Sequence, residues 1–268
     1  MTRDPFLCDG PTVVSFSGGR TSGLMLRRVL DAHGGVLPPD VHVVFTNTGK
    51  ERSETLLFVA ECATRWDVPI HWLERPAEGG VAEVDSASAS RRGEPFDALL
   101  QHRGYLPNPS MRFCTTELKV RVMRDWMRAR GYDHWVNCVG LRADEPRRVA
   151  SGRASDGSQR WTLAYPLFDA GVTVADVQAF WTAQPFDLAL RPWEGNCDVC
   201  YLKHISKRSR IIEDRPDLAT WWIDAERRAG APFRDNEPSF FSLLEWTKTQ
   251  RRLPMIDDLT SVDCGCTD

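Results

Sequence analysis

The sequence has no apolar run long enough to span a bilayer, and residues 1–10 lack the apolar core of a signal peptide. These absences favour a cytoplasmic protein without a membrane-spanning segment. An excess of positive charge is also absent: 34 Lys and Arg stand against 37 Asp and Glu, so no overall basic field marks the chain as a nucleic-acid binder. The phosphate-loop patterns G-x-x-x-x-G-K-[ST] and G-x-G-x-x-G are missing too, which excludes the two commonest nucleotide loops.

What remains is an ordinary globular composition, with 42% hydrophobic and 26% charged residues in 268 positions. A chain of this length can bury a sizeable core, and one α/β domain with a smaller appendage is the natural interpretation. We expect an α/β domain over residues 1–185 and a mainly helical region over residues 186–268, which ends in a flexible tail. The eight cysteines are not expected to form disulfides in a reducing compartment, which leaves metal binding, redox chemistry or burial.

One short stretch predicts a ligand site near the start of the chain. Residues 13–16 read Val-Val-Ser-Phe, with β-branched and aromatic side chains around one serine. Residues 17–22 read Ser-Gly-Gly-Arg-Thr-Ser, and helical apolar spacing begins at Leu24. Glycines at such a turn bring backbone N–H groups close to a ligand, and the start of the helix adds partial positive charge. Residues 17–22, called the first loop below, are therefore predicted to bind an anion, most plausibly phosphate.

Strands and helices alternate along the first two thirds of the sequence. Strands are expected over residues 41–45, 70–73 and 134–139, and helices over residues 53–66, 116–130 and 174–181. This alternation predicts a doubly wound, mostly parallel α/β sheet with ligands beyond the carboxyl ends of its strands. Residues 74–109 show little periodicity and are expected to form a loop near the site. Beyond residue 185, helical segments are expected over residues 205–213, 216–228 and 239–247.

Three segments in the same order resemble one protein family. The first loop resembles the S-G-G-x-[DT]-S loop of the PP-loop superfamily. Residues 47–55, the second loop, resemble the [DN]-T-G-x-x-x-x-E-T segment of phosphoadenosine phosphosulfate (PAPS) reductases, and residues 140–148, the third loop, resemble their G-x-R-x-x-[QE]-[SP]-x-R element. The chain is similar to PAPS reductase-like proteins, including those of phages and prophages. The resemblance implies the Rossmann-like fold of the adenine nucleotide alpha hydrolases.

The resemblance also implies roles for individual residues around ATP or a sulfonucleotide (PAPS or adenylylsulfate, APS). The nucleotide would contact the three loops and the end of the first strand through Ser15, Ser17, Gly18, Gly19, Arg20, Thr21, Ser22, Asn47, Thr48, Gly49, Glu54 and Gly140. Arg142 and Arg148 are the catalytic candidates, because the guanidinium fork matches phosphate or sulfate oxygens; a solvated charge run is the alternative. Mg²⁺ is an optional cofactor, since Thr21 offers no carboxylate where the family commonly has Asp.

The cysteines suggest a metal site that the family resemblance makes more specific. Cys197 and Cys200 form a C-x-x-C, which suits zinc, redox chemistry or iron–sulfur. With Cys114 they match three of the four [4Fe–4S] ligands of the iron–sulfur members, and related tRNA-thiolating enzymes use three cysteines and an open iron. The fourth ligand could be His204, Cys264 or Cys266, or the position could be open; zinc is the alternative metal.

Two weaker signals complete the sequence evidence. Residues 263–266 read Asp-Cys-Gly-Cys and vaguely resemble the E-C-G-x-H end of PAPS reductases, in which a mobile cysteine attacks sulfur; Cys264 is that candidate, and a free tail is the alternative. A basic run after the C-x-x-C could contact a polyanion, although a solvated helix face is the commoner explanation. It consists of Lys203, Lys207, Arg208 and Arg210.

These features lead to three functional hypotheses. The preferred one is ATP-dependent, iron–sulfur-assisted sulfur transfer to a nucleic acid or nucleotide, served by a reductant or sulfur-donor protein. The second is a sulfonucleotide reductase that releases sulfite, and the third is a nucleotide-sensing module without chemistry. The oligomeric state is not predicted.

Overall fold

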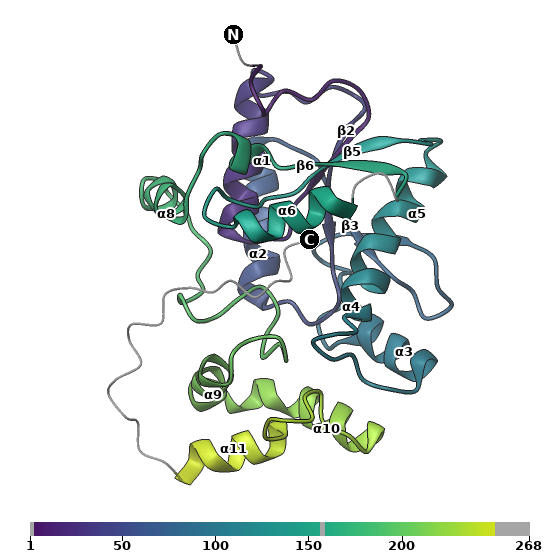
Figure 1. Ribbon diagram of the computed structural model, residues 1–268, viewed down its shortest axis with the longest axis vertical. Helices are drawn as coiled ribbons and strands as arrows, with labels where there is room; N and C mark the ends of the chain where they lie inside the picture. The colour runs from purple at the N-terminus through teal and green to yellow at the C-terminus, as the bar shows by residue number, and fades with distance from the viewer. Residues whose placement is uncertain (1–2, 156–158, 250–268) are drawn as a thin grey trace.

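The computed structural model describes residues 3–155 and 159–249 and has a six-stranded sheet at its centre (Figure 1). The strands are β1 Thr12–Ser15, β2 Val41–Thr46, β3 Ile70–Glu74, β4 Ala82–Val84, β5 Trp135–Cys138 and β6 Trp161–Ala164. Their order is β4-β3-β2-β1-β5-β6, and all neighbours are parallel except the edge pair β3 and β4. The chain order reverses beside β1, which makes the carboxyl end of this strand the place where an open α/β sheet binds ligands.

The helices follow the strands in the alternation that the sequence predicts. They are α1 Arg20–Ala32, α2 Ser53–Trp66, α3 Glu94–Arg103, α4 Phe113–Thr115, the π-helical turn η1 Thr116–Val120, α5 Arg121–Ala129, α6 Pro146–Ser155, α7 Pro166–Asp169, α8 Val174–Thr182, α9 Ile205–Asp214, the 3₁₀ turn η2 Pro216–Leu218, α10 Ala219–Ala229 and α11 Phe240–Thr249. Among the described helices, none is long and apolar enough to cross a membrane.

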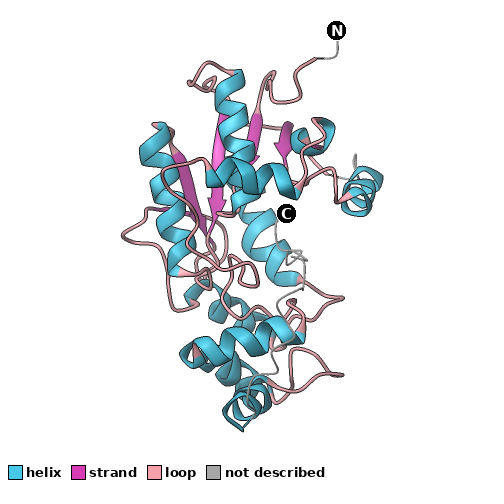
Figure 2. Ribbon diagram, turned by 90° about the vertical axis from the view of Figure 1, so that its left-hand side faces the viewer, coloured by secondary structure: helices cyan, strands magenta, loops and turns pink. Residues whose placement is uncertain are grey.

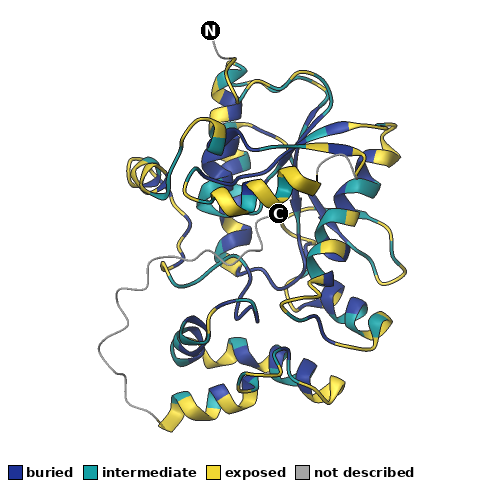
Figure 3. Ribbon diagram, viewed as in Figure 1, coloured by how far each residue is buried: buried dark blue, intermediate teal, exposed yellow. Residues whose placement is uncertain are grey.

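Both faces of the sheet are covered, as the buried, almost continuously apolar strands require. Val14 of β1 packs with α1, α2 and α8 in one core, while its neighbour Val13 packs with α5 in a second core on the other face. Figure 2 shows the strands between these helices, and Figure 3 shows the buried residues along them. The predicted doubly wound, mostly parallel α/β fold is confirmed.

The C-terminal helices form a further core at one end of the molecule (Figure 1). Its centre is aromatic: Trp222 stacks on Phe240 with ring centroids 5.2 Å apart, and Tyr201 stacks on Phe233 at 5.2 Å. Phe96 of α3 belongs to the same core, so this region is helical, as predicted, but it also uses side chains from before residue 185. The proposed boundary between residues 185 and 186 remains a prediction.

Two strands and two helices were not expected from the sequence. The helices are α3, inside the segment predicted to be a loop, and α6, at the end of the third loop. β4 has three residues and pairs antiparallel with β3 inside the segment predicted to be a loop, and β6 extends the other edge beside β5. Both are short edge strands whose pairing partners lie elsewhere in the chain, so local periodicity gave little signal for them.

Candidate functional site

The first loop leaves β1 at the carboxyl edge of the sheet and leads directly into α1. Gly18 has a φ of +76°, and a Cβ there would lie 2.6 Å from Cγ2 of Thr55. Gly140, at the end of β5, comes close to the same turn, since its Cβ would lie 3.4 Å from the Ser22 Cα. Glycine is therefore needed at position 18 for conformation and space, and Gly140 lets the first and third loops approach each other.

The first loop presents hydrogen-bond donors toward the edge of the sheet. The hydroxyls of Ser17 and Ser22 lie 3.0 Å apart, and Ser22 also bonds the Gly19 carbonyl at 3.0 Å. Within residues 3–155 and 159–249, the backbone N–H groups of Arg20 and Thr21 have no acceptor, as expected for the first turn of a helix. Such donors, with the helix dipole behind them, suit an anion.

Arg20 makes a different contact from the one expected of it. Its guanidinium donates two 2.7 Å hydrogen bonds to the Asp187 carboxylate, and it also reaches the carbonyl groups of Leu188 and Leu190. In this arrangement its charge ties residues 187–190 to the start of α1. Its role in binding a phosphate stays a prediction.

The third loop brings a buried arginine to the first loop. Arg142 donates from Nη1 to the Thr21 hydroxyl at 3.1 Å and from Nε to Asp144 at 2.9 Å. Arg148 is less buried and pairs with Glu145, which also accepts the backbone N–H of Arg142. Of the two catalytic candidates, Arg142 thus contacts the first loop directly.

Ser15 and the second loop form the rest of the edge. The Ser15 hydroxyl donates to Oδ1 of Asn137 on β5 at 2.6 Å. The amide of Asn47 donates to Glu74 at 2.6 Å, while Thr48 donates to Glu51 through both its N–H and its hydroxyl at 2.8 Å. These buried bonds fix the shape of the loop.

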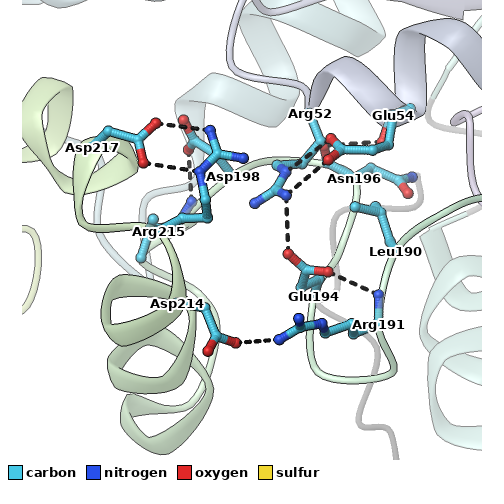
Figure 4. Close-up of polar contacts among 12 residues, drawn as sticks. Arg52, Glu54, Leu190, Arg191, Glu194, Asn196, Asp198, Asp214, Arg215 and Asp217 are labelled. Atoms are coloured by element: carbon cyan, nitrogen blue, oxygen red, sulfur yellow. Dashed lines mark hydrogen bonds and ion pairs between the residues drawn. The ribbon is translucent and has the colours of Figure 1, made fainter.

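Glu54, at the start of α2, lies on the outer side of this edge. Its carboxylate bonds the guanidinium of Arg52, which also contacts Glu194 at 3.0 Å (Figure 4). Burial opposes ionisation of Glu54, but the hydrogen bonds from Arg52 and from its own N–H outweigh it and lower its pKa. The carboxylate is therefore held ionised by Arg52.

The segment that carries the C-x-x-C crosses the second loop. Residues 194–200, called the strap below, pair antiparallel with it at Glu51 and Cys197. The Asn196 carbonyl accepts the Arg52 N–H at 2.7 Å, and the Asp198 N–H donates to the Lys50 carbonyl at 2.9 Å. The Asn196 side chain reaches the first loop, where its amide donates to the Ser17 carbonyl at 2.8 Å.

Sequence reasoning missed the residues that dock the strap. Lys50 pairs with Asp198 at 2.8 Å between largely buried side chains, and it lies 4.8 Å from the ring centroid of Trp221. Glu51 accepts from Thr48 and lies 3.6 Å from the ammonium of Lys119. The one signal for this docking in the sequence was Asp198, an acidic residue inside the C-x-x-C. Its partner Lys50 is far away in the sequence and meets it only in the folded protein.

The predicted cysteine ligands share one core but do not form a metal site. Cys114 Sγ lies 3.4 Å from the hydroxyl of Tyr201, the residue after Cys200, and Cys197 Sγ lies 3.8 Å from Oε1 of Glu51. Across the described residues, no three His, Cys, Asp or Glu side chains form a group that could hold a metal ion. The three thiols are therefore not gathered into a ligand set in this structure, and their role as cluster or zinc ligands stays a prediction.

Of the candidate fourth ligands, the structure describes only His204. His204 is exposed, and its Nδ1 bonds Ser206 at 2.7 Å at the start of α9. Cys264 and Cys266 lie outside the described residues.

The basic run after the C-x-x-C is turned inward for most of its length. Lys203, Lys207 and Arg208 are buried. Lys203 donates to the Asp198 carbonyl at 2.9 Å, and Arg208 pairs with Glu237. Burial lowers the pKa of Arg208 to about 10. The interpretation of these three side chains as a polyanion contact is wrong, because they are buried. Lys203 and Arg208 instead stabilise the strap and the C-terminal core.

Comparison with known proteins agrees with the geometry of the fold. A family profile described as the phosphoadenosine phosphosulfate reductase domain matches residues 11–186. The uncharacterized nin region protein ORF290 of Escherichia phage lambda is 31% identical over 219 residues, which cover 77% of this chain and 71% of that protein.

Two solved structures are similar at low sequence identity. The PAPS reductase from Candida auris, a phosphate complex, is 15% identical with a TM-score of 0.42, over 67% of this chain and 76% of that one. The U34-tRNA thiolase NcsA from Methanococcus maripaludis, with its [4Fe-4S] cluster, is 12% identical with a TM-score of 0.46, over 92% and 73%. The extent of the family match and the identity to the phage protein show that the chain belongs to the PAPS reductase-like family of PP-loop proteins.

Proposed function

We propose that this protein is an enzyme that binds an adenine nucleotide with its phosphate end against the first loop. The observation that carries the proposal is the pair of unpartnered N–H groups at Arg20 and Thr21, in the described part of the chain, beside the hydroxyls of Ser17 and Ser22. These donors lie at the carboxyl end of the central strand, where Arg142 contacts Thr21. Donors fixed by the fold bind an anion without a large cost of reorganisation.

The remaining predicted residues take their proposed roles from this position. The glycines of the first and third loops allow the ligand close access, and Arg142 and Arg148 neutralise negative charge that develops on phosphate. The rest would line the nucleotide along the edge of the sheet. They are Ser15, Asn47, Thr48, Gly49 and Glu54.

The preferred reaction is adenylation followed by sulfur transfer to a nucleic acid or nucleotide. An acceptor oxygen attacks the α-phosphorus of ATP, the bond to pyrophosphate breaks, and pyrophosphate leaves from the first loop. A sulfur nucleophile from a donor protein or sulfide then displaces AMP from the activated carbon. Support comes from the strap, which brings Cys197 and Cys200 to the loop system through Asn196 and Ser17.

An iron–sulfur cluster or zinc on Cys114, Cys197 and Cys200 is a separate prediction, for which the described residues supply no formed ligand set. No step above passes through such a group. Iron, sulfide and zinc analysis of protein purified without oxygen decides the matter.

Sulfonucleotide reduction is the second candidate, because the family profile of PAPS reductases matches residues 11–186. In that reaction a cysteine thiolate, with Cys264 as the candidate, attacks the sulfate sulfur of PAPS. The bond from that sulfur to the bridging phosphate oxygen breaks, and adenosine bisphosphate leaves. An external dithiol then reduces the thiosulfonate and releases sulfite.

Calorimetry and product analysis with ATP and with PAPS test these proposals. We expect one of the two nucleotides to bind, and Ser17→Ala to weaken binding about tenfold, as loss of a hydrogen bond to a charged group predicts. Ser242→Ala, at an exposed serine of α11, is the matched control and leaves binding unchanged. Pyrophosphate and AMP from ATP support sulfur transfer, whereas sulfite from PAPS, lost in Cys264→Ser, supports reduction. Nucleotide binding without product formation supports the hypothesis of a sensing module. If neither nucleotide binds, the proposal is refuted.

A further inference from the structure

The strap joins the first loop to the C-x-x-C through one residue. Asn196 donates from its side chain to the Ser17 carbonyl at 2.8 Å, and its own carbonyl accepts the Arg52 N–H at 2.7 Å. The next residue along, Cys197, is bridged to Glu51. A shift of the first loop that moves Asn196 therefore acts on the residue next to Cys197.

Asn196 is also closely packed against its neighbours. A Cβ at Gly19 would lie 3.2 Å from the Asn196 amide nitrogen, so the side chain lies directly against the first loop. Thr55 contributes a 3.4 Å hydrogen bond from its hydroxyl to the Asn196 carbonyl, and its Cγ2 lies where a Cβ of Gly18 would be. The first loop, the start of α2 and the strap thus meet at this asparagine.

We propose that Asn196 is a positioning residue that couples an anion bound at the first loop to the stability of the pairing between the strap and the second loop. The inference rests on the proposed function, because it requires a ligand at the first loop. An anion held by the N–H groups of Arg20 and Thr21 fixes the loop, and the fixed Ser17 carbonyl holds the Asn196 amide more firmly. Ordering then extends to the backbone bonds between the strap and residues 50–52.

Hydrogen exchange of the full-length protein measures the stability of this pairing. Peptides covering residues 48–54 and 194–200 report the Arg52 and Asp198 amides that join the two segments. We expect saturating ATP, or PAPS if that is the nucleotide that binds, to slow their exchange at least about fivefold, the lower end of typical coupling between sites. A peptide from α11 should not change, because this helix packs mainly against α9 and α10.

Two variants separate coupling from ordinary stabilisation. Asn196→Ala should still bind nucleotide by calorimetry but lose the slowing at the strap, whereas Asn236→Ala, at an exposed asparagine of the C-terminal region, should behave as the parent protein. Asn196→Asp keeps the size of the side chain and removes its N–H donor. It should also lose the slowing at the strap, and it takes the place of the alanine variant in the test if that variant does not fold.

The outcomes distinguish this inference from the function beneath it. Nucleotide binding with unchanged strap exchange, or equal slowing in both Asn196 variants and the parent, overturns the coupling and leaves the proposed function intact. Equal slowing of the α11 peptide also overturns it, since the effect is then global. Absence of any nucleotide binding overturns both.

Discussion

Replacing Asp198 by asparagine removes one charge from a buried ion pair and changes little else. Oδ2 of Asp198 accepts from the Lys50 ammonium at 2.8 Å, and the two side chains are 7% and 8% exposed. Oδ1 accepts separately from Trp222 Nε1 and from the Val199 N–H, each at 2.7 Å, and asparagine can keep both bonds. The Trp221 ring faces Lys50 in both proteins, so it does not offset the change. The loss of stability therefore comes mainly from the ion pair between Asp198 and Lys50.

Removing one partner of a buried pair leaves an uncompensated charge, which costs about 3–5 kcal/mol of unfolding free energy. Urea unfolding followed by tryptophan fluorescence measures this loss. Glu245→Gln is the matched control, because Glu245 pairs with Lys248 at 2.6 Å on the surface and such pairs contribute less than about 1 kcal/mol. Adding Lys50→Met to Asp198→Asn should restore part of the stability, since no ammonium is then left buried. A loss below about 1 kcal/mol for Asp198→Asn, equal to that of the control, would refute the reasoning.

Two further predictions concern the first loop and the start of the chain. Gly18→Ala should lower the free energy of unfolding in urea by about 2–5 kcal/mol, because alanine disfavours the left-handed backbone and its Cβ would lie too close to Thr55. Adding Thr55→Ser should recover only the steric part of this loss. Full recovery would contradict the backbone contribution. A hydrogen bond from Cys138 lowers the pKa of Cys8 to about 6, with help from His33 and against the effect of burial. Since the thiolate reacts, alkylation of Cys8 should be half-maximal near pH 6, and Cys138→Ala should move the profile to higher pH; a parent midpoint near 8.5 would contradict the contact.

Local patterns predicted the framework of the α/β part correctly. Apolar blocks of strand and helix length alternate up to about residue 182, and the glycines of the first loop stand where a strand must turn sharply into a helix. Such signals depend on neighbours within a few residues, which is why the fold class and the place of the first loop could be inferred without coordinates. The extra edge strands β4 and β6 depend on distant partners and were not found.

The strap shows what the linear sequence leaves open. Glu51 and Cys197 are 146 positions apart, and nothing near either one indicates that their backbones pair. Lys203 and Arg208 are residue types that normally lie on a solvated surface, yet both are buried and bonded to other groups of the chain.

The sequence by itself determined the alternation of the main strands and helices and the position of the first loop between β1 and α1, because backbone propensity and hydrophobic period are local properties. Only the tertiary structure decided which charges are buried and which thiols approach that loop, since desolvation and pairing depend on the groups that distant segments bring together.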